Sequence, residues 1–352
     1  MSFGGSLRQP LHHEVDERQH RGQRDDDRRH RHVHLVQAQV ADFVEPDLVA
    51  TRDGVLVARH ENEIGGTTDV ASHPEFAARR TAKVIDGARV EGWFTEDFTL
   101  AELKTLRAKE RLPDLRRGNT RFDGMFEIPA FEEILALVRA VDWQRQMLAQ
   151  QAGKPAAAAL GVYPETKHPS YFAGIGLPLE PPLLAVLHRW GYAGRTAPVY
   201  IQSFETANLK ALRKLTDLPL TQLIDSDGRP YDWVLAGDPR TLAQMLAPQG
   251  LREIAAYADA IGVNKSLIIP RKADGSLAAP TALVADAHAA GLRVHAWTFR
   301  AENEFLPAQF RTGGAPGDLG DMAGELRTFL ATGLDGYFTD HPDLGRKVSR
   351  RP

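Results

Sequence analysis

The chain has 352 residues, of which 43% are hydrophobic, and its net charge is −3. This charge gives no reason to expect a nucleic acid or an anionic membrane surface as a partner. The chain has no cysteine, which excludes disulfides, thiolate metal ligands and cysteine nucleophiles. No apolar run approaches the ~20 residues of a spanning helix, so we expect no integral membrane association. No apolar signal core follows Met1. The localisation therefore stays open: periplasmic if the true start lies upstream, otherwise cytoplasmic.

Residues 1–40 read differently from the rest of the chain. Six of the 13 histidines lie between Leu11 and His34, mixed with arginine and aspartate and with neither a helical nor a strand period. Such a composition favours disorder. We hypothesise that about the first 38 residues are a wrong-frame or misassigned start, joined to a genuine enzyme body over 41–352. The first strand of that body would then be missing, which leaves its sheet with an open edge.

The first regular element of the body is a β-hairpin. Two short apolar runs, Asp42–Ala50 and Val55–Arg59, flank a turn that contains Asp53 and Gly54. Asp-Gly between such runs is a strong hairpin signal, because glycine tolerates positive φ and aspartate bonds its own backbone.

Three polar side chains meet across this hairpin. Folding about Arg52–Asp53 places Glu45 opposite His60, and a register shifted by one or two makes Asp47 the neighbour instead. Glu45 and Asp47 are two residues apart, so they share one face of their strand. Solvated carboxylates and a structural histidine are the simpler interpretation, but unpaired charges among apolar neighbours are costly to bury. We therefore predict a site for a hard metal ion with an acid/base group beside it.

Residues 64–126 are predicted to form an insertion that caps the body and forms one wall of a substrate cleft. Within it, Thr99 and Glu102 form a capping-box pair, and leucines follow on one side of the helix that this pair begins.

From Phe131 onward, short apolar strands alternate with helical stretches. A helix begins after Ile128-Pro129 and ends at Gly153. Further strands are expected at Ala157–Tyr163, Pro198–Gln202, Leu218–Ile224, Leu267–Ile269, Arg293–Trp297 and Gly336–Phe338, and helices at Leu183–Arg189, Leu251–Ala260, Thr281–Ala290 and Leu326–Thr332. This alternation implies a mostly parallel sheet with crossover helices. Together with the hairpin it predicts an α/β fold, a TIM-type (β/α)8 barrel whose first strand is in doubt.

Polar residues follow many of these strands, at the ends that converge on one face of a barrel. They are Glu45, Asp47, His60, Glu165, Lys167, Gln202, Glu205, Thr298 and Asp340. An acidic set with one lysine and no cysteine suits Ca²⁺ or Mg²⁺ better than Zn²⁺. Glu165 and Lys167 share a strand face, where a plain ion pair between them is the alternative interpretation.

Several motifs resemble the glycerophosphodiester phosphodiesterase family, in the family's order, from about Ala41 to the end of the chain. They are E-P-D at 45–47, T-R-D-G at 51–54, V-L-V-A-R-H-E at 55–61 and T-T-D-V at 67–70. The stretch G-W-F-T-E-D-F-T-L-A-E-L-K at 92–104 is similar to the insertion of the bacterial branch that works with calcium. The resemblance implies metal-dependent hydrolysis of small glycerophosphodiesters to an alcohol and glycerol 3-phosphate by histidine acid/base catalysis. Ca²⁺ is expected in preference to Mg²⁺, and the oligomeric state stays open.

The resemblance also implies roles for individual residues. Metal ligands would be Glu45, Asp47 and Glu165; substrate contacts would be Arg21, Lys167, Phe204 and Trp297; and the catalytic pair would be His60 and His20. As plain core aromatics Phe204 and Trp297 would be unremarkable.

The N-terminal segment is where the chain departs from the family. His20-Arg21-Gly22 lacks the preceding apolar strand, and no glutamate follows it; Asp25, Asp26 or Asp27 could replace the missing ligand, and the choice stays open. An alternative function is therefore a catalytically impaired barrel that only binds cation and phosphate. A related phospholipase on the same barrel is a third possibility, which the insertion at 92–104 disfavours.

Overall fold

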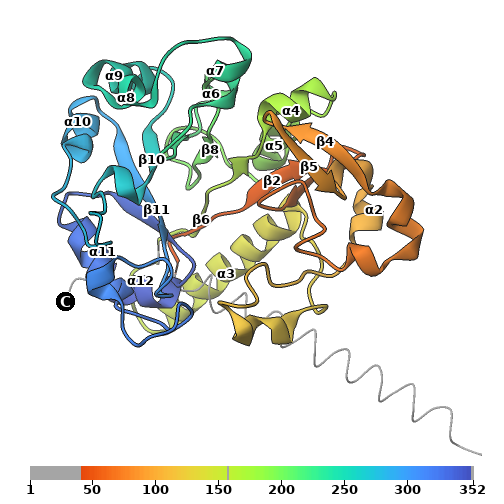
Figure 1. The fold of residues 1–352 in the computed structure, drawn as a ribbon, viewed down its shortest axis with the longest axis horizontal. Coiled ribbons are helices and arrows are strands. Elements are labelled where there is room, and N and C mark those ends of the chain that lie inside the picture. Colours follow the sequence, from red (N-terminus) through yellow and green to blue (C-terminus); the bar gives the residue numbers. More distant parts are fainter. Residues whose placement is uncertain (1–40, 157, 350–352) are drawn as a thin grey trace, which may run out of the picture.

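The computed structural model describes residues 41–156 and 158–349. Its main sheet has the strand order β12-β11-β10-β9-β8-β7-β2-β3, and every neighbouring pair is parallel except β2 with β3 (Figure 1). These strands are β2 (Asp47–Ala50), β3 (Leu56–Ala58), β7 (Glu165–Thr166), β8 (Ile201–Ser203), β9 (Leu220–Ile224), β10 (Ala260–Asn264), β11 (Arg293–Phe299) and β12 (Gly336–Thr339). A second parallel pair joins β1 (Phe43–Val44) to β6 (Gly161–Val162).

Two of the long strands are each interrupted by a proline. Pro46 separates β1 from β2, and Pro164 separates β6 from β7. Proline has no N–H to donate to the ladder, so the regular pairing lapses there. The chains nevertheless stay side by side, because Tyr163 N donates to Val44 O at 2.8 Å and Glu165 N donates to Pro46 O at 2.9 Å. The strand expected at Asp42–Ala50 is thus one extended segment whose regular hydrogen-bond pairing is interrupted at Pro46.

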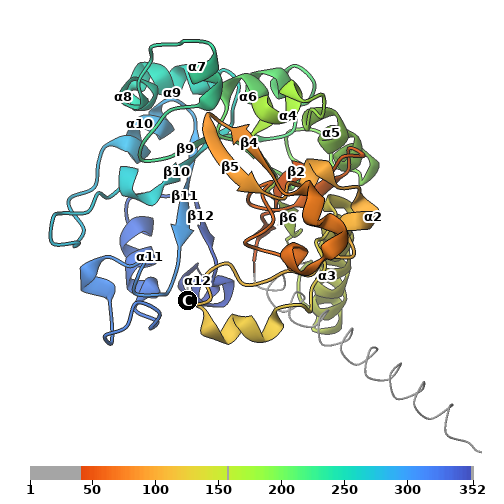
Figure 2. The same ribbon diagram turned by 45° about the vertical axis from the view of Figure 1, so that its right-hand side comes forward.

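Helices surround the curled sheet on its outer side (Figures 1 and 2). They are α3 (Phe131–Gln151), α4 (Pro169–Gly174), α5 (Glu180–Arg189), α6 (Thr206–Arg213), α7 (Tyr231–Leu235), α8 (Leu242–Leu246), α9 (Pro248–Ala255), α10 (Leu283–Ala289), α11 (Met322–Leu330) and α12 (Pro342–Ser349). The longest, α3, buries a stripe of apolar side chains at helical spacing that includes Phe131, Ile134 and Val138. No helix among the described residues is long and apolar enough to cross a bilayer.

The inside of the sheet carries a layer of rings, the aromatic floor, made of Tyr163, Tyr200, His295 and Phe338. Tyr163 stacks on Tyr200 with ring centroids 5.0 Å apart. The Tyr163 hydroxyl lies 2.8 Å from His295 Nδ1 and 2.6 Å from Thr221 Oγ1, so its polar atom is satisfied. Burial lowers the pKa of His295 to about 4, which keeps the imidazole neutral.

The sheet is open between β12 and the β1–β2 strand. Within 41–156 and 158–349, β12 pairs with β11 alone. Arg346 Nη1 approaches Asp42 Oδ1 at 3.0 Å near this opening. The hypothesis about residues 1 to about 38 falls outside the described residues.

The insertion contains an antiparallel hairpin that the sequence reading missed. Strands β4 (Thr81–Ile85) and β5 (Ala88–Gly92) turn at Asp86-Gly87, where φ is 48° and 81°. Two consecutive positive φ values match the tight two-residue hairpin turn that Asp-Gly favours. The signal was therefore present in the sequence. Figures 1 and 2 show the hairpin beside α4 and β2.

The rest of the insertion is short helical turns. They are η1 (Val70–Ser72), η2 (Pro74–Arg79), η3 (Thr95–Asp97), α2 (Leu100–Leu103) and η4 (Arg117–Phe122), and the remaining 3-10 turns of the chain are η5 (Lys265–Leu267) and η6 (Ala308–Phe310). The expected capping box at α2 is confirmed, since Thr99 Oγ1 accepts from Glu102 N and Glu102 Oε2 accepts from Thr99 N.

Two secondary-structure expectations were wrong. The helix expected at Leu251–Ala260 ends at Ala255, and the following A-I-G-V-N is the buried strand β10. The strand expected at Leu267–Ile269 is absent: Leu267 is the last residue of η5, which has Asn264 as its N-cap, and Ile268 and Ile269 form the turn that follows. A short apolar run does not distinguish strand from helix by periodicity alone.

The hairpin register also differs from the first expectation. Leu48 pairs with Ala58 and Val49 with Val57. Glu45 is therefore not opposite His60: the register is shifted by one, which places Arg59 beside Asp47, and Arg59 N donates to Asp47 O at 2.9 Å. The turn spans five residues, Thr51 to Val55, so its centre lies at Asp53.

Candidate active site

Three polar side chains form a row across neighbouring strands. Asp47 on β2 is in register with Glu165 on β7, which is in register with Gln202 on β8. Residues in register on adjacent strands point to the same side of a sheet. Gln202 Nε2 donates to Glu45 Oε1 at 2.7 Å, which brings the fourth residue into the same cluster.

The carboxylates of Glu45, Asp47 and Glu165 form one group. Each contributes an oxygen, and these oxygens lie within 4.8 Å of one another. Burial, and then the charge of Asp47, raise the pKa of Glu45 well above its usual value, although its tip still reaches solvent. Burial also raises the pKa of Glu165, which is 5% exposed. Burial is the largest cause of both shifts, and the negative charge of Asp47 adds to them.

Lys167 is the cation that the structure places against this group. Its Nζ lies 3.0 Å from Glu165 Oε1 and 3.4 Å from Asp47 Oδ1. Burial alone would lower the pKa of Lys167, but the two carboxylates raise it above its usual value, so the ammonium stays charged. The alternative interpretation, that Lys167 is an ion-pair partner, describes its contacts. Within 41–156 and 158–349, this lysine is the one cation that pairs with the three carboxylates.

Aromatic rings line the side of the cluster near Lys167. Lys167 Nζ lies 5.7 Å from the Phe204 ring centroid, and Phe204 meets Trp297 edge to face with centroids 5.8 Å apart. Trp297 Nε1 donates to Gly262 O at 2.9 Å, which fixes the indole. An apolar wall with a cation at its edge can bind a molecule with a carbon skeleton and an anionic end.

His60 lies at the rim of the site, and its side chain is 62% exposed. Its Nδ1 is 2.8 Å from Glu61 Oε1, and Glu61 Oε2 is 3.0 Å from His168 Nε2. The charge of Glu61 also raises the pKa of Lys167, but less than the two carboxylates that pair with this lysine do. His20 and Arg21 lie outside the described residues.

Comparison with known proteins shows which family the chain belongs to. The model of the glycerophosphoryl diester phosphodiesterase family matches residues 33–344. The chain belongs to this family. The phosphodiesterase is 34% identical over 314 residues to glycerophosphodiester phosphodiesterase GDPD6 of Arabidopsis thaliana, with 85% of this chain and 76% of that one covered. It is 28% identical over 350 residues to glycerophosphodiester phosphodiesterase of Treponema pallidum, and the match covers 90% of this chain and 86% of that one. The family and enzyme predictions are confirmed.

Solved structures of the same type share its fold. A Silicibacter pomeroyi protein, provisionally described as a glycerophosphoryl diester phosphodiesterase, superposes with a TM-score of 0.55 at 20% identity over 86% of this chain and 82% of that one. Glycerophosphodiester phosphodiesterase from Agrobacterium tumefaciens superposes with a TM-score of 0.50 at 16% identity, covering 89% and 90%. The expected TIM-type barrel is confirmed.

Two polar residues around the site of the phosphodiesterase have structural partners. Glu205 accepts from Ser170 N at 3.2 Å, and burial raises its pKa to about 7. Asp340 accepts from Arg116 Nη2 at 2.6 Å and from Arg300 Nε at 2.8 Å.

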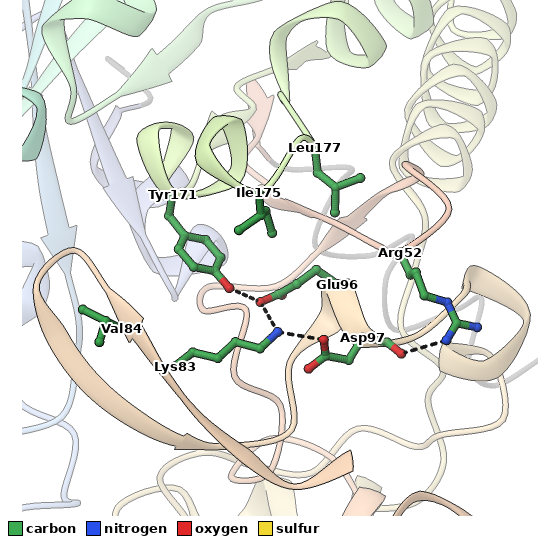
Figure 3. Close-up of a pocket in the computed structure, with 8 residues that line it drawn as sticks. All are labelled: Arg52, Lys83, Val84, Glu96, Asp97, Tyr171, Ile175 and Leu177. Carbon is green, nitrogen blue, oxygen red and sulfur yellow. Dashed lines mark hydrogen bonds and ion pairs between the residues drawn. The ribbon is translucent and has the colours of Figure 1, made fainter.

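A separate open cleft of about 620 Å³ lies between β4, η3 and α4 (Figure 3). Its charged side chains are mutually paired: Lys83 Nζ bonds Glu96 Oε1 at 2.9 Å and Asp97 Oδ1 at 2.8 Å, and the Tyr171 hydroxyl donates to Glu96 Oε1 at 2.5 Å. The residues that line this cleft come from both the insertion and the barrel, and none of them is a site residue predicted from the sequence.

Sequence reasoning missed Glu61, Asp86 and His168 as neighbours of the site. His168 directly follows Lys167 in the sequence. Its position after a strand that ends in Glu165-Thr166-Lys167 is the signal that could have placed it at the functional end of the barrel.

Proposed function

We propose that the chain hydrolyses glycerophosphodiesters to an alcohol and glycerol 3-phosphate, with a divalent cation held by Glu45, Asp47 and Glu165. The observation that carries this proposal is the charge imbalance of the cluster, in which three carboxylates pair with one cation, Lys167 Nζ, among the residues that the structure describes. When bound, the cation would polarise a phosphoryl oxygen and neutralise charge that develops during the reaction.

The residues of the cluster fit such a cation. Their donors are oxygens, which hard cations prefer, and a bound cation would offset the repulsion from Asp47 that adds to the effect of burial on the pKa values of Glu45 and Glu165. Gln202 Oε1 is buried and has no hydrogen-bond partner among the described residues, so an acceptor is available beside the carboxylates. We expect Ca²⁺ in preference to Mg²⁺, because Ca²⁺ tolerates irregular carboxylate geometry and Mg²⁺ demands a near-ideal octahedron.

Two histidines would move the protons. One takes a proton from the attacking water as its oxygen bonds phosphorus, and the other gives a proton to the leaving alcohol oxygen as the P–O ester bond breaks. Each such step is typically worth ~10²–10⁴-fold. By family resemblance the pair is His60 and His20, with Arg21 and Lys167 on the phosphate. Phe204 and Trp297 would contact the glycerol carbons.

The second candidate is a barrel that binds cation and phosphate without turnover. It is favoured by the unusual surroundings of His20-Arg21-Gly22, which lacks the family's apolar strand before it and the glutamate after it. Loss of His20 from the site would remove one acid/base group, and loss of the glutamate one ligand.

The deciding experiment is release of glycerol 3-phosphate from glycerophosphocholine by the full chain, with Ca²⁺, with Mg²⁺ and with EDTA. EDTA-sensitive turnover supports the hydrolase. Calcium binding by calorimetry without turnover supports the impaired barrel.

His60→Ala should lower turnover by about 10²–10⁴-fold while calcium binding persists, because His60 would supply acid/base catalysis and no metal ligand. His288→Ala is the matched control, since His288 also pairs one carboxylate, Asp335, at 2.8 Å and is partly exposed. An active His60→Ala enzyme would remove His60 from the mechanism.

A further inference from the structure

A single imidazole, that of His168, joins two separate parts of the chain beside the site. His168 Nδ1 lies 2.6 Å from Asp86 Oδ2, and its Nε2 lies 3.0 Å from Glu61 Oε2. The side chain is 17% exposed. We call these three residues, Glu61, Asp86 and His168, the clasp.

The first partner of His168 is the tip of the insertion hairpin. Asp86 and Gly87 form the turn between β4 and β5, and their nearest pairing is Ile85 with Ala88. The tip also reaches the chain after β9, because a Cβ added at Gly87 would lie 3.6 Å from the Tyr231 ring. The tip of the hairpin therefore lies between the residues that follow β7 and the beginning of α7, and the hairpin itself lies beside β2 and α4 (Figures 1 and 2).

The second partner of His168 leads to the proposed acid/base group. Glu61 binds His168 through Oε2 and His60 Nδ1 through Oε1, at 2.8 Å for the latter. A carboxylate on one ring nitrogen fixes the tautomer and orientation of an imidazole, which leaves the other nitrogen for chemistry. His168 thus sits between the hairpin and the residue that holds His60.

The charges of the clasp are complementary. Burial alone lowers the pKa of His168, but its hydrogen bonds to Asp86 and Glu61 raise it to about 9. The two histidine neighbours of Glu61 lower the pKa of that carboxyl, against the opposing effect of burial. His168 also keeps φ at 48°, a left-handed backbone that is uncommon for residues other than glycine and asparagine. The observed contacts offer a reason to retain histidine there.

We propose that His168 is a positioning residue, which holds the β4–β5 hairpin against the mouth of the barrel and, through Glu61, holds His60 in its catalytic orientation. This inference rests on the proposed function for the role of His60. The hairpin docking is independent of it. The insertion is then a working wall of the substrate site, and its contribution depends on one side chain at the end of β7.

The test has an arm that needs no turnover. In His168→Ala, hydrogen exchange of amides 81–92 should accelerate at least about 10-fold, because the tip loses its partner at the barrel. Asp86→Gly should give the same acceleration; glycine accepts the positive φ of this turn, and the tip lies outside the barrel core. The double variant should add little to either single change, since both remove one interaction.

The kinetic arm separates orientation from folding. His168→Ala should lower kcat by about 10–100-fold, the range typical for partners that orient a working group. Asp86→Gly should mainly raise KM, because Glu61 and His60 keep their contact while the wall loosens.

His73→Ala is the matched control. His73 also contacts two carboxylates, Asp69 at 3.6 Å and Glu75 at 2.9 Å, and is 22% exposed, but both its partners are local. It should leave kcat and the exchange of 81–92 unchanged. Unchanged hairpin exchange in both His168→Ala and Asp86→Gly would overturn the clasp. Accelerated exchange in a protein with no wild-type turnover would retain the docking and reject the proposed function instead.

Discussion

Two clusters of acidic residues lie at the end of the barrel where the strands terminate, and they differ in charge balance. The first, which we call the ligand cluster because we propose that it binds a cation, sets Glu45, Asp47 and Glu165 against Lys167, its one cationic partner among the described residues. The second, which we call the arginine cluster, sets Glu302 and Asp340 against Arg116 and Arg300.

The pKa shifts of the two clusters have opposite signs. In the ligand cluster the pKa of Glu45 and that of Glu165 are raised by burial, assisted by the neighbouring carboxylates. In the arginine cluster, burial alone would raise the pKa of Asp340, but Arg300 and Arg116 lower it below its usual value. A cluster whose positive and negative charges are equal can stabilise the fold. A cluster with an excess of carboxylates keeps negative charge that a cationic ligand can neutralise. Charge balance, and not acidity, is therefore the feature that distinguishes the proposed metal site from the arginine cluster.

The comparison would break if the two clusters responded alike to removal of one charge. Asp47→Asn keeps the shape of the side chain but removes a ligand charge, so turnover of glycerophosphocholine should fall on the order of 10³-fold. Asp340→Asn is the matched change in the arginine cluster. Turnover per folded molecule should stay within about 3-fold of wild type there. Equal losses in the two variants would contradict the distinction.

Removal of a cation should have its larger effect on stability in the arginine cluster. Arg116 Nε lies 2.6 Å from Glu302 Oε1, and that glutamate is 3% exposed. Arg116→Ala leaves the buried carboxylate with only the His341 imidazole nearby, 4.0 Å from Glu302 Oε2, so the free energy of unfolding should fall by about 3 kcal/mol. Urea denaturation measures this change. Arg80→Ala is the control, since its pair with Glu91 is exposed and worth about 0–1 kcal/mol.

The two clusters should also differ in how pH affects stability. The folded-state pKa of Glu165 is raised, so without metal the fold binds more protons than the unfolded chain. Stability in EDTA should therefore fall as pH rises from about 4.5 toward the raised value, by up to about 1.4 kcal/mol per pH unit for such a group.

The pH dependence of stability that arises from Asp340 has the opposite sign. Its stabilising contribution is present above the unfolded pKa of about 3.9 and is lost as pH falls through its lowered folded pKa. Thermal melts from pH 3 to pH 9 in EDTA test both signs. Glu165→Gln should reduce the loss of stability above pH 4.5 and leave the loss of stability at acid pH unchanged. An unchanged loss of stability above pH 4.5 would show that the ligand cluster does not cause it.

Much of the site followed from the sequence because it depends on short-range periodicity. Glu45 and Asp47, like Glu165 and Lys167, are two residues apart on strands, so each pair shares a face whatever the rest of the chain does. Alternation of strands and helices then brings the ends of neighbouring parallel strands together. Phe204 and Trp297, on different strands, meet for the same reason.

Tertiary structure alone decided the contacts between distant segments. The hairpin register moved by one residue, because the five-residue turn and the pairing of Leu48 with Ala58 set it. Arg116 reaches Glu302 and Asp340, which are 186 and 224 residues away, and Asp86 reaches His168 across 82 residues. No local period encodes such pairs, since they depend on how an inserted hairpin and loop pack onto a finished barrel. Sequence therefore determined which residues stand at the ends of the strands, and packing determined which of them hold one another in place.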